Sequence, residues 1–293
     1  MTKTPSLNVR IEALRKEYET LRPGKERLLV VLEEAEIAES VYNSNAIENS
    51  TLTLKETETI LTEGTIPRTV TLREVHEAQN LAKVSEVLRS AAPKGMTQEA
   101  ILDLHRMLLT GIDDPIAGRF RSSGEYVRVG THIAPGPERI ERMLGNALAE
   151  YGSDLRHTAV RKIAKFHLAF ELIHPFNDGN GRIGRVLVNW QLRELGFPPV
   201  IIRNKEKNAY YTALREYQYT KEEKPMERIL SLAIMESLHK RIAHLKGESI
   251  VPLSEYVRRK KKAAPAVFNA ARRQTLGAFR ERNKWMIGEP GRK

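Results

Sequence analysis

The stretch HPFNDGNGRIGR, residues 174–185, gathers a histidine, a carboxylate, three glycines and two arginines within twelve positions. Helical periodicity precedes it. Pro175 neither continues a helix nor favours the α conformation in the residue before it, so His174 should stand at a helix exit. Its imidazole is the one group of the stretch that can accept a proton near neutral pH. The stretch therefore predicts a general base presented at the end of a helix.

The second half of the stretch predicts a site for a polyphosphate. A helix should begin near Gly181 or Arg182, and the first N–H groups of a helix have no internal partner. Glycine lets the backbone approach an anion closely. Arg182 and Arg185 lie three positions apart and share one helix face, where two forked cations suit phosphate groups. Asp178 beside them is a natural ligand for Mg²⁺, which proteins often hold by a carboxylate together with phosphate oxygens.

Two other interpretations of the same residues carry less weight. The three glycines fit the dinucleotide pattern GxGxxG, but that pattern needs a preceding strand, and a helix is expected here. His167, Glu171 and His174 lie at i, i+4 and i+7 and could imitate a set of metal ligands. Their spacing is not HExxH, and we expect His167 to be a core histidine.

Composition places these residues in a globular protein with room for two or three domains. The chain has 293 residues, of which 41% are hydrophobic and 29% charged, which is typical of a soluble globular fold. There is no cysteine, which excludes disulfides and thiolate metal sites. The sequence has no apolar run of membrane-spanning length and no secretory signal, so we expect a cytoplasmic protein with no membrane partner.

Helical periodicity dominates, and we expect a mainly α fold with a short β-hairpin. The glycine- and proline-rich stretch 115–137 interrupts the helices, and EYVRVGTHI within it alternates like a hairpin. Thr53 and Thr97 are expected helix caps. The expected helices cover residues 10–22, 25–47, 54–62, 72–89, 98–109, 138–151, 160–173, 182–195, 209–219 and 227–245.

The net charge of +11 is concentrated at the C-terminal end. Residues 246–293 hold 13 Lys and Arg against 4 Asp and Glu, a net charge of +9. Helices over 255–263 and 265–274, followed by two strands around 282–283, resemble an excisionase-type winged helix-turn-helix. Duplex DNA is then a possible partner, through Asn269, Arg272 and Arg273. The alternative is a packing or dimerisation module with a solvated face.

HPFNDGNGRIGR matches the HPFx[D/E]GNGRxxR signature of Fic-domain proteins at every fixed position. YVRVGTHIAPGPERI, 126–140, resembles the flap of that family, and GRFR, 118–121, resembles the segment that leads into it. NKEKNAYYTALREY, 204–217, resembles the segment on the nucleotide side. The resemblance covers roughly residues 25–240, and it implies a Fic-type helical fold with a β-hairpin flap.

The resemblance implies an enzyme that moves AMP from ATP to a Ser, Thr or Tyr hydroxyl of a protein. His174 would deprotonate the hydroxyl, which attacks the α-phosphate while pyrophosphate leaves, and Phe176 would pin the loop into the core. A Doc-type branch phosphorylates its target and carries lysine in place of the first arginine. Arg182 therefore favours AMP transfer, although another nucleotide donor stays open. The resemblance assigns Asp178 to Mg²⁺ and the phosphates to Gly179, Asn180, Gly181, Arg182 and Arg185.

The flap and two adjacent tyrosines complete the implied site. A short strand at a cleft rim can take an extended peptide by main-chain pairing, which would position a target hydroxyl. The predicted target-binding residues of the flap are Val127, Arg128, Val129, Gly130, Thr131 and His132. Tyr210 and Tyr211 point about 100° apart on a helix. One could line an adenine pocket and bind nucleotide, and the other could belong to the core.

SNAIEN, residues 44–49, resembles the inhibitory motif [S/T]xxxE[G/N] of some Fic proteins through Ser44, Glu48 and Asn49. In those proteins the glutamate pairs with the second signature arginine, here Arg185. The γ-phosphate is then displaced and the α-phosphate misaligned. The simpler interpretation is a helix that ends in Glu-Asn, since asparagine is a common C-terminal cap. A glutamate near the α-phosphate could also orient water for AMP removal.

These observations predict three parts: an N-terminal helical region with the inhibitory helix at 1–97, a catalytic core at 98–245, and a basic winged-helix-like module at 246–293. We expect an autoinhibited protein adenylyltransferase that uses ATP and Mg²⁺ and modifies a target protein and itself. A homodimer is possible. The alternative is a DNA-binding regulator whose Fic domain senses a nucleotide. Intact His174 and Asp178 favour the enzyme.

Overall fold

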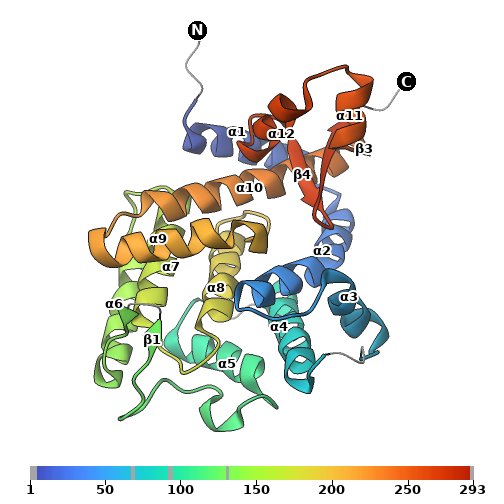
Figure 1. Ribbon diagram of the computed structural model, residues 1–293. Helices are drawn as coiled ribbons and strands as arrows, with labels where there is room; N and C mark the ends of the chain where they lie inside the picture. Colours follow the sequence, from blue (N-terminus) through green and yellow to red (C-terminus); the bar gives the residue numbers. More distant parts are fainter. Residues whose placement is uncertain (1–4, 67–69, 92–94, 130–131, 291–293) are drawn as a thin grey trace. The chain divides into compact units, whose positions relative to one another are not determined.

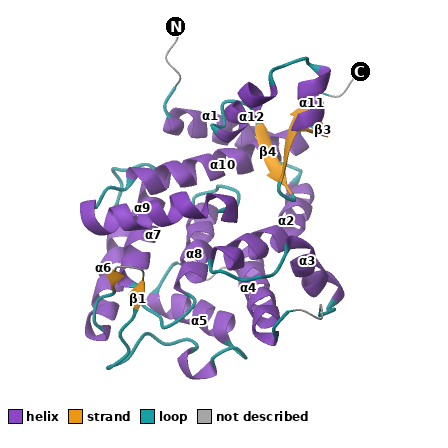
Figure 2. Cartoon of the chain, viewed as in Figure 1, coloured by secondary structure: helices purple, strands orange, loops and turns teal. Residues whose placement is uncertain are grey.

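The computed structural model describes residues 5–66, 70–91, 95–129 and 132–290, and it is mainly helical (Figures 1 and 2). By packing, the chain divides into two compact units. One comprises Met1–Glu36, Gly196–Ile201 and Arg228–Lys293, and the other comprises Ile37–Leu195 and Ile202–Glu227. The division of the sequence at residues 97 and 245 stays a prediction.

The unit formed by Ile37–Leu195 and Ile202–Glu227 contains the signature stretch. Its core joins the antiparallel pair α7 and α8 to α4 and α5, around Phe170, Phe176, Ile183 and Trp190. Thr53 caps α3 through the predicted capping box with Glu56, and the other helices begin and end close to the predicted bounds. The helices are the second half of α2 (Glu26–Ile47), α3 (Leu54–Glu63), α4 (Leu72–Ala91), α5 (Gln98–Leu109), α6 (Ile140–Ser153), α7 (Ala159–Ile173), α8 (Asn180–Glu194), α9 (Lys207–Thr220) and the first residues of α10 (Lys224–Leu245).

The predicted hairpin is present as two short antiparallel strands. β1 (Arg128–Val129) pairs with β2 (His132–Ile133), with Arg128 opposite Ile133 and Val129 opposite His132. Gly130 and Thr131, predicted to bind a target here, lie outside the described residues. We call residues 126–135 the flap.

The other unit, Met1–Glu36 with Gly196–Ile201 and Arg228–Lys293, holds α1 (Leu7–Leu21), the first part of α2, most of α10 and the C-terminal elements. A small core of Leu253, Val267, Ala271, Ala278 and Ile287 supports the C-terminal elements. Their bounds are β3 (Ser249–Pro252), α11 (Leu253–Arg259), α12 (Ala264–Arg272), β4 (Ala278–Glu281) and β5 (Lys284–Glu289).

The sequence predicted both helices and both strands of this C-terminal segment, but it missed β3. β5 lies between β3 and β4 in an antiparallel sheet. The helix predicted over 255–263 extends too far, because α11 ends at Arg259. Lys261, just beyond it, adopts a left-handed conformation with φ 49°. The second predicted helix ends two residues early, before Gln274 at φ 54°. Among the described residues, no helix is long and apolar enough to cross a membrane.

Candidate active site

His174 ends α7 in a left-handed conformation, with φ 49° and its N–H donating to the carbonyl of Phe170 at 2.9 Å. The following Pro175 explains why the helix stops here. Burial lowers the pKa of His174 to about 4, although the backbone carbonyl of Glu171 opposes the shift. The imidazole is therefore neutral at neutral pH and can accept a proton, as a general base must.

Contacts of Asn180, Phe176 and His105 hold the loop that follows His174. Asn180 clamps it from within, because its Oδ1 accepts from the Phe176 N–H at 2.9 Å and its Nδ2 donates to the Phe176 carbonyl at 2.8 Å. The ring of Phe176 stacks on His105 with centroids 3.7 Å apart. His105 accepts from the Gly118 N–H at Nδ1, so its Nε2 carries the proton and donates to the Asp178 carbonyl at 3.0 Å.

These contacts add two roles that the sequence did not predict, one for the side chain of Asn180 and one for His105. The side chain of Asn180 holds the loop, and its assignment with Gly179 and Gly181 to a backbone anion cradle stays a prediction. His105 was missed because a histidine on the apolar face of α5 reads as an ordinary core residue. The one available signal was GRFR, whose Gly118 adopts φ 74° in close contact with α5 at Arg106.

Arg121, the last residue of GRFR, ties the flap to the catalytic loop. It is buried, and its backbone N–H donates to the Pro175 carbonyl at 2.9 Å. Its guanidinium donates to the carbonyls of His174 at 2.9 Å, Glu125 at 3.0 Å and Pro135 at 2.9 Å. Because one rigid fork joins both segments, the position of the flap is fixed relative to the base.

The residues of the predicted anion cradle, Gly179, Asn180 and Gly181, lie where α8 begins. Gly179 caps the helix at φ 80°, and the free N–H groups of the first turn carry the positive end of the helix dipole. The carboxylate of Glu48 already lies against this turn. A Cβ added at Gly181 would overlap its Oε1, so only glycine permits the approach.

Glu48 and Ser44 both contact Arg185, one turn further along α8. Arg185 donates from Nε to the Ser44 hydroxyl at 2.9 Å and from Nη2 to the Ser44 carbonyl at 2.8 Å. The same Nη2 lies 2.9 Å from Glu48 Oε1. Burial would lower the pKa of Arg185, but Glu48 raises it, and the net shift is upward. Asn49 ends the segment at φ 71° and accepts from Lys207 Nζ at 2.8 Å.

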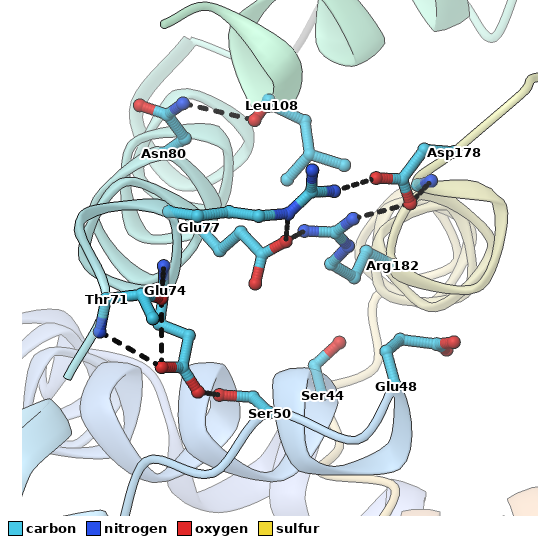
Figure 3. A network of polar contacts seen from close by, with 12 residues as sticks. Ser44, Glu48, Ser50, Thr71, Glu74, Glu77, Asn80, Leu108, Asp178 and Arg182 are labelled. Atoms are coloured by element: carbon cyan, nitrogen blue, oxygen red, sulfur yellow. Dashed lines mark hydrogen bonds and ion pairs between the residues drawn. The ribbon is translucent and has the colours of Figure 1, made fainter. Parts of the chain in front are cut away.

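Asp178 is paired with two arginines. Its Oδ1 lies 2.9 Å from Arg182 Nη2, and its Oδ2 lies 2.5 Å from Arg73 Nη2. Glu77 bridges the same two cations, at 3.2 Å from Arg182 Nη1 and 3.1 Å from Arg73 Nε (Figure 3). Partial burial would raise the pKa of Asp178, but Arg182 lowers it below its usual value. Sequence reasoning missed Arg73 and Glu77, which belong to α4.

Asp178 fits Mg²⁺ only in partnership with a nucleotide. Within the described parts of the chain, no three Asp, Glu, His or Cys side chains come together as a metal cluster. A single carboxylate beside an anion cradle matches the way Mg²⁺ is held, by one or two carboxylates plus phosphate oxygens. His167, Glu171 and His174 are therefore not such a cluster either, and His167 Nε2 is engaged with the Tyr210 hydroxyl at 2.7 Å.

A cavity of about 480 Å³ opens between the flap, α7 and α9. This volume is in the range of small-molecule sites. Its lining includes Val129, His132, Glu171 and Tyr211. Burial, with the nearby charge of Glu48, raises the pKa of Glu171 to about 8, so this carboxyl is mostly protonated at neutral pH.

The two tyrosines of α9 and the residues of the flap differ in whether they line the cavity and in what holds them. Tyr211 lines the cavity and donates to the Ile47 carbonyl at 2.9 Å. Tyr210, also predicted to bind nucleotide, does not line the cavity, because its ring is buried against His167 and Arg185. In the flap, His132 is tied to the Leu172 carbonyl at 2.8 Å, while Val129 is exposed. Val127 accepts from the Ala134 N–H through its carbonyl at 3.1 Å.

This combination of helices, flap and loop defines the chain as a protein with a Fic fold. Residues 95–192 match the model of the Fic/DOC family. A Fic-domain-containing signaling protein from Bacteroides thetaiotaomicron has a similar structure, with a TM-score of 0.74 and 27% identity, covering 82% of this chain and 97% of that one.

Two further comparisons bear on the particular relatives. A protein adenylyltransferase Fic from Nematostella vectensis is 35% identical over 184 residues, which cover 60% of this chain and 42% of that protein. The chain thus spans less than half the length of this curated relative. A Fic family protein from Desulfovibrio desulfuricans G20 covers 100% of this chain and 99% of its own, with a TM-score of 0.68 and 20% identity, and shares the fold.

Proposed function

We propose that the Fic domain transfers AMP from ATP to a Ser, Thr or Tyr hydroxyl of a protein, including this chain itself. The observation that carries the proposal is the neutral imidazole of His174 at the start of the short loop that leads to Gly179, Arg182 and Arg185. A cavity of about 480 Å³, lined by Glu171 of the same helix and by Tyr211, adds room for a nucleoside. The adenylyltransferase name of the relative from Nematostella vectensis supports the same reaction.

In this mechanism each residue has a stated task. His174 accepts the hydroxyl proton as the oxygen bonds to the α-phosphorus, and the bond to pyrophosphate breaks. The cradle N–H groups and Arg182 and Arg185 hold phosphate oxygens, where fixed donors stabilise developing charge. Asp178 would hold Mg²⁺, which offsets phosphate charge when bound. The cavity takes the nucleoside against Tyr211, and the flap presents the target backbone near the base.

Autoinhibition belongs to the same proposal. Glu48 occupies Arg185 and lies against Gly181, where outer phosphates would bind. With this carboxylate in place, the γ-phosphate loses its arginine and the α-phosphate is misaligned for attack. The same carboxylate, near the α-phosphate, could orient water for removal of AMP from a modified protein.

The test is to incubate the full chain, wild type and Glu48→Gly, with Mg²⁺ and ATP labelled at either the α- or the γ-phosphate. We expect protein-bound label from α-labelled ATP and none from γ-labelled ATP, because the α-phosphate stays with the transferred AMP. Label from γ-labelled ATP would instead show phosphorylation. If unlabelled GTP, UTP or CDP-choline suppresses labelling more strongly than ATP does, the donor is another nucleotide. No label from either position would contradict ATP as the donor.

The C-terminal segment supports a second proposed function, binding of duplex DNA. Asn269, Arg272 and Arg273 are exposed at the end of α12, and Arg272 donates to Asn269 Oδ1 at 3.1 Å. α12 is the second helix of a helix-turn-helix-like pair followed by β4 and β5, the arrangement in which the second helix enters the major groove. A DNA-binding regulator with a nucleotide-sensing Fic domain remains the competing proposal for the whole chain.

We expect the full chain to bind a duplex in a fluorescence-anisotropy titration. Affinity should fall with salt, with a log–log slope of about −0.9 per phosphate contact. The double variant Arg272→Glu, Arg273→Glu should lose binding, while Arg142→Glu, an exposed arginine on α6, should retain it. Equal loss in both would indicate non-specific attraction, and no binding at low salt would make the segment a packing or dimer module.

A further inference from the structure

Arg73 on α4 covers one oxygen of the carboxylate that the proposed function assigns to Mg²⁺. Asp178 Oδ1 faces Arg182 and also accepts from the Gly179 N–H, so it is committed to the loop. Oδ2 is the oxygen left to a metal, and Arg73 Nη2 lies 2.5 Å from it. We propose that Arg73 is a resident cation at the magnesium position, and that Mg²⁺ arriving with a nucleotide has to displace it. The inference rests on the proposed function and specifies its regulation.

Charge explains why the two cations exclude each other. Arg73, Arg182, Asp178 and Glu77 form a neutral cluster of two positive and two negative groups. A divalent ion bound to Oδ2 would stand beside the guanidinium at a separation where like charges repel strongly. Either the metal ion or the Arg73 guanidinium has to leave Oδ2. The metal ion has the advantage, because it is also bound by the phosphate oxygens of the nucleotide.

Exposure explains why Arg73 is the partner that can leave. Its side chain is 54% exposed, whereas that of Arg182 is 4% exposed. An exposed ion pair contributes little to stability, so its loss costs little. Arg73 Nε also lies 3.1 Å from Glu77 Oε1, a contact that can hold the side chain once it leaves Asp178. Glu77 meanwhile continues to hold Arg182 in place for a phosphate.

The neighbouring Glu74 connects Arg73 to the inhibitory segment. Glu74 Oε1 accepts from the Thr51 N–H at 2.8 Å and from the Thr51 hydroxyl at 2.7 Å. Ser50 Oγ lies 3.4 Å from the same oxygen (Figure 3). Its other oxygen accepts from Thr71 at the start of α4. The chain segment directly after Glu48 is thus joined to the helix turn that carries Arg73. Glu48, which pairs with Arg185, and Arg73, which pairs with Asp178, are therefore linked through Thr51 and Glu74.

The experiment measures metal binding rather than catalysis. Mn²⁺, a paramagnetic substitute for Mg²⁺, is titrated into the Glu48→Gly chain of residues 1–293, saturated with an ATP analogue that cannot be cleaved between the α- and β-phosphates. Free Mn²⁺ is counted by electron paramagnetic resonance. Adding Arg73→Gln should tighten Mn²⁺ binding about two- to fivefold, the equivalent of one exposed ion pair. Arg73→Lys should change it less, and Arg142→Gln, remote from the site, should not change it.

Unchanged or weaker Mn²⁺ binding in Arg73→Gln overturns the inference. Weaker binding of the analogue at fixed Mn²⁺ would make Arg73 a phosphate ligand rather than a competitor of the metal. In an Asp178→Asn background the effect of Arg73→Gln should vanish, and an effect that persists also counts against the proposal. Because none of these measurements needs transfer of AMP, failure of the proposed reaction would show in the labelling test and leave this result readable.

Discussion

Replacement of His174 by alanine should abolish covalent AMP labelling and leave nucleotide binding intact. A positioned general base contributes about 10²–10⁴-fold to rate. The other histidines around the loop are engaged, because His105 donates to the Asp178 carbonyl, His132 contacts the Leu172 carbonyl and His167 contacts Tyr210. The measurement is label transferred from α-labelled ATP in the Glu48→Gly background, with binding of a fluorescent ATP analogue measured in parallel.

The pH profile gives the same assignment an independent check. With the pKa of His174 lowered to about 4, the base is neutral above that pH and becomes an imidazolium, unable to accept a proton, as the pH falls through it. Labelling should therefore persist below pH 6.5 and decline towards pH 4. The matched control is His157→Ala, an exposed histidine paired with Asp154, which should label like its parent. Parent-like labelling by the His174→Ala variant would remove His174 from the mechanism.

The reactive part of the site could be predicted because it is local in sequence. Pro175 stops α7 and Gly179 starts α8, so the local pattern of twelve consecutive residues is enough to predict the order of the base, the cradle and both arginines. The two signature arginines lie on one face of α8, as their spacing requires. Glu48 could be placed on Arg185 only through the resemblance, since the pair is separated by 137 positions and no spacing rule links them.

The supporting residues could not be predicted, because their contacts are long-range. Arg73 meets Asp178 across 105 positions, His105 meets the same loop across 73, and Arg121 reaches the His174 carbonyl across 53. Each lies in a segment whose local pattern reads as an ordinary helix or turn. The roles of His105 and Arg121 arise only when tertiary packing brings a buried donor to a carbonyl that needs one. The role of Arg73 arises when packing brings its exposed guanidinium to the Asp178 carboxylate.

The same distinction holds for the secondary structure. Hydrophobic periodicity predicts long amphipathic helices such as α5 and α7, and their bounds were predicted to within two residues. β3 is four residues long, ends at Pro252 and gains its hydrogen bonds from β5, more than thirty positions later. A strand defined by its partner leaves too weak a local signal to be read from SIVP alone.

Substitution of Glu48 by glycine should raise labelling of the chain and of its targets about ten- to hundredfold over wild type. The carboxylate takes Arg185 Nη2 at 2.9 Å and lies against Gly181, so its removal frees both the arginine and the cradle for the γ- and β-phosphates. The expected factor is that of one charge-assisted hydrogen bond regained by the nucleotide, about 1.5–3 kcal/mol. The measurement is initial labelling rate at matched ATP and Mg²⁺ concentrations.

Three companion variants separate loss of the carboxylate from loss of the arginine. Glu48→Gln keeps the size of the side chain but removes its charge, and should activate less than Glu48→Gly. Ser44→Ala removes only the 2.9 Å bond from Arg185 Nε and leaves Glu48 in place, so activation should be small. Arg185→Ala also breaks the pair but should not activate, because the same guanidinium has to seat the γ-phosphate. Equal rates for Glu48→Gly and wild type, or activation by Arg185→Ala, would mean that Glu48 stabilises the end of α2 and does not inhibit.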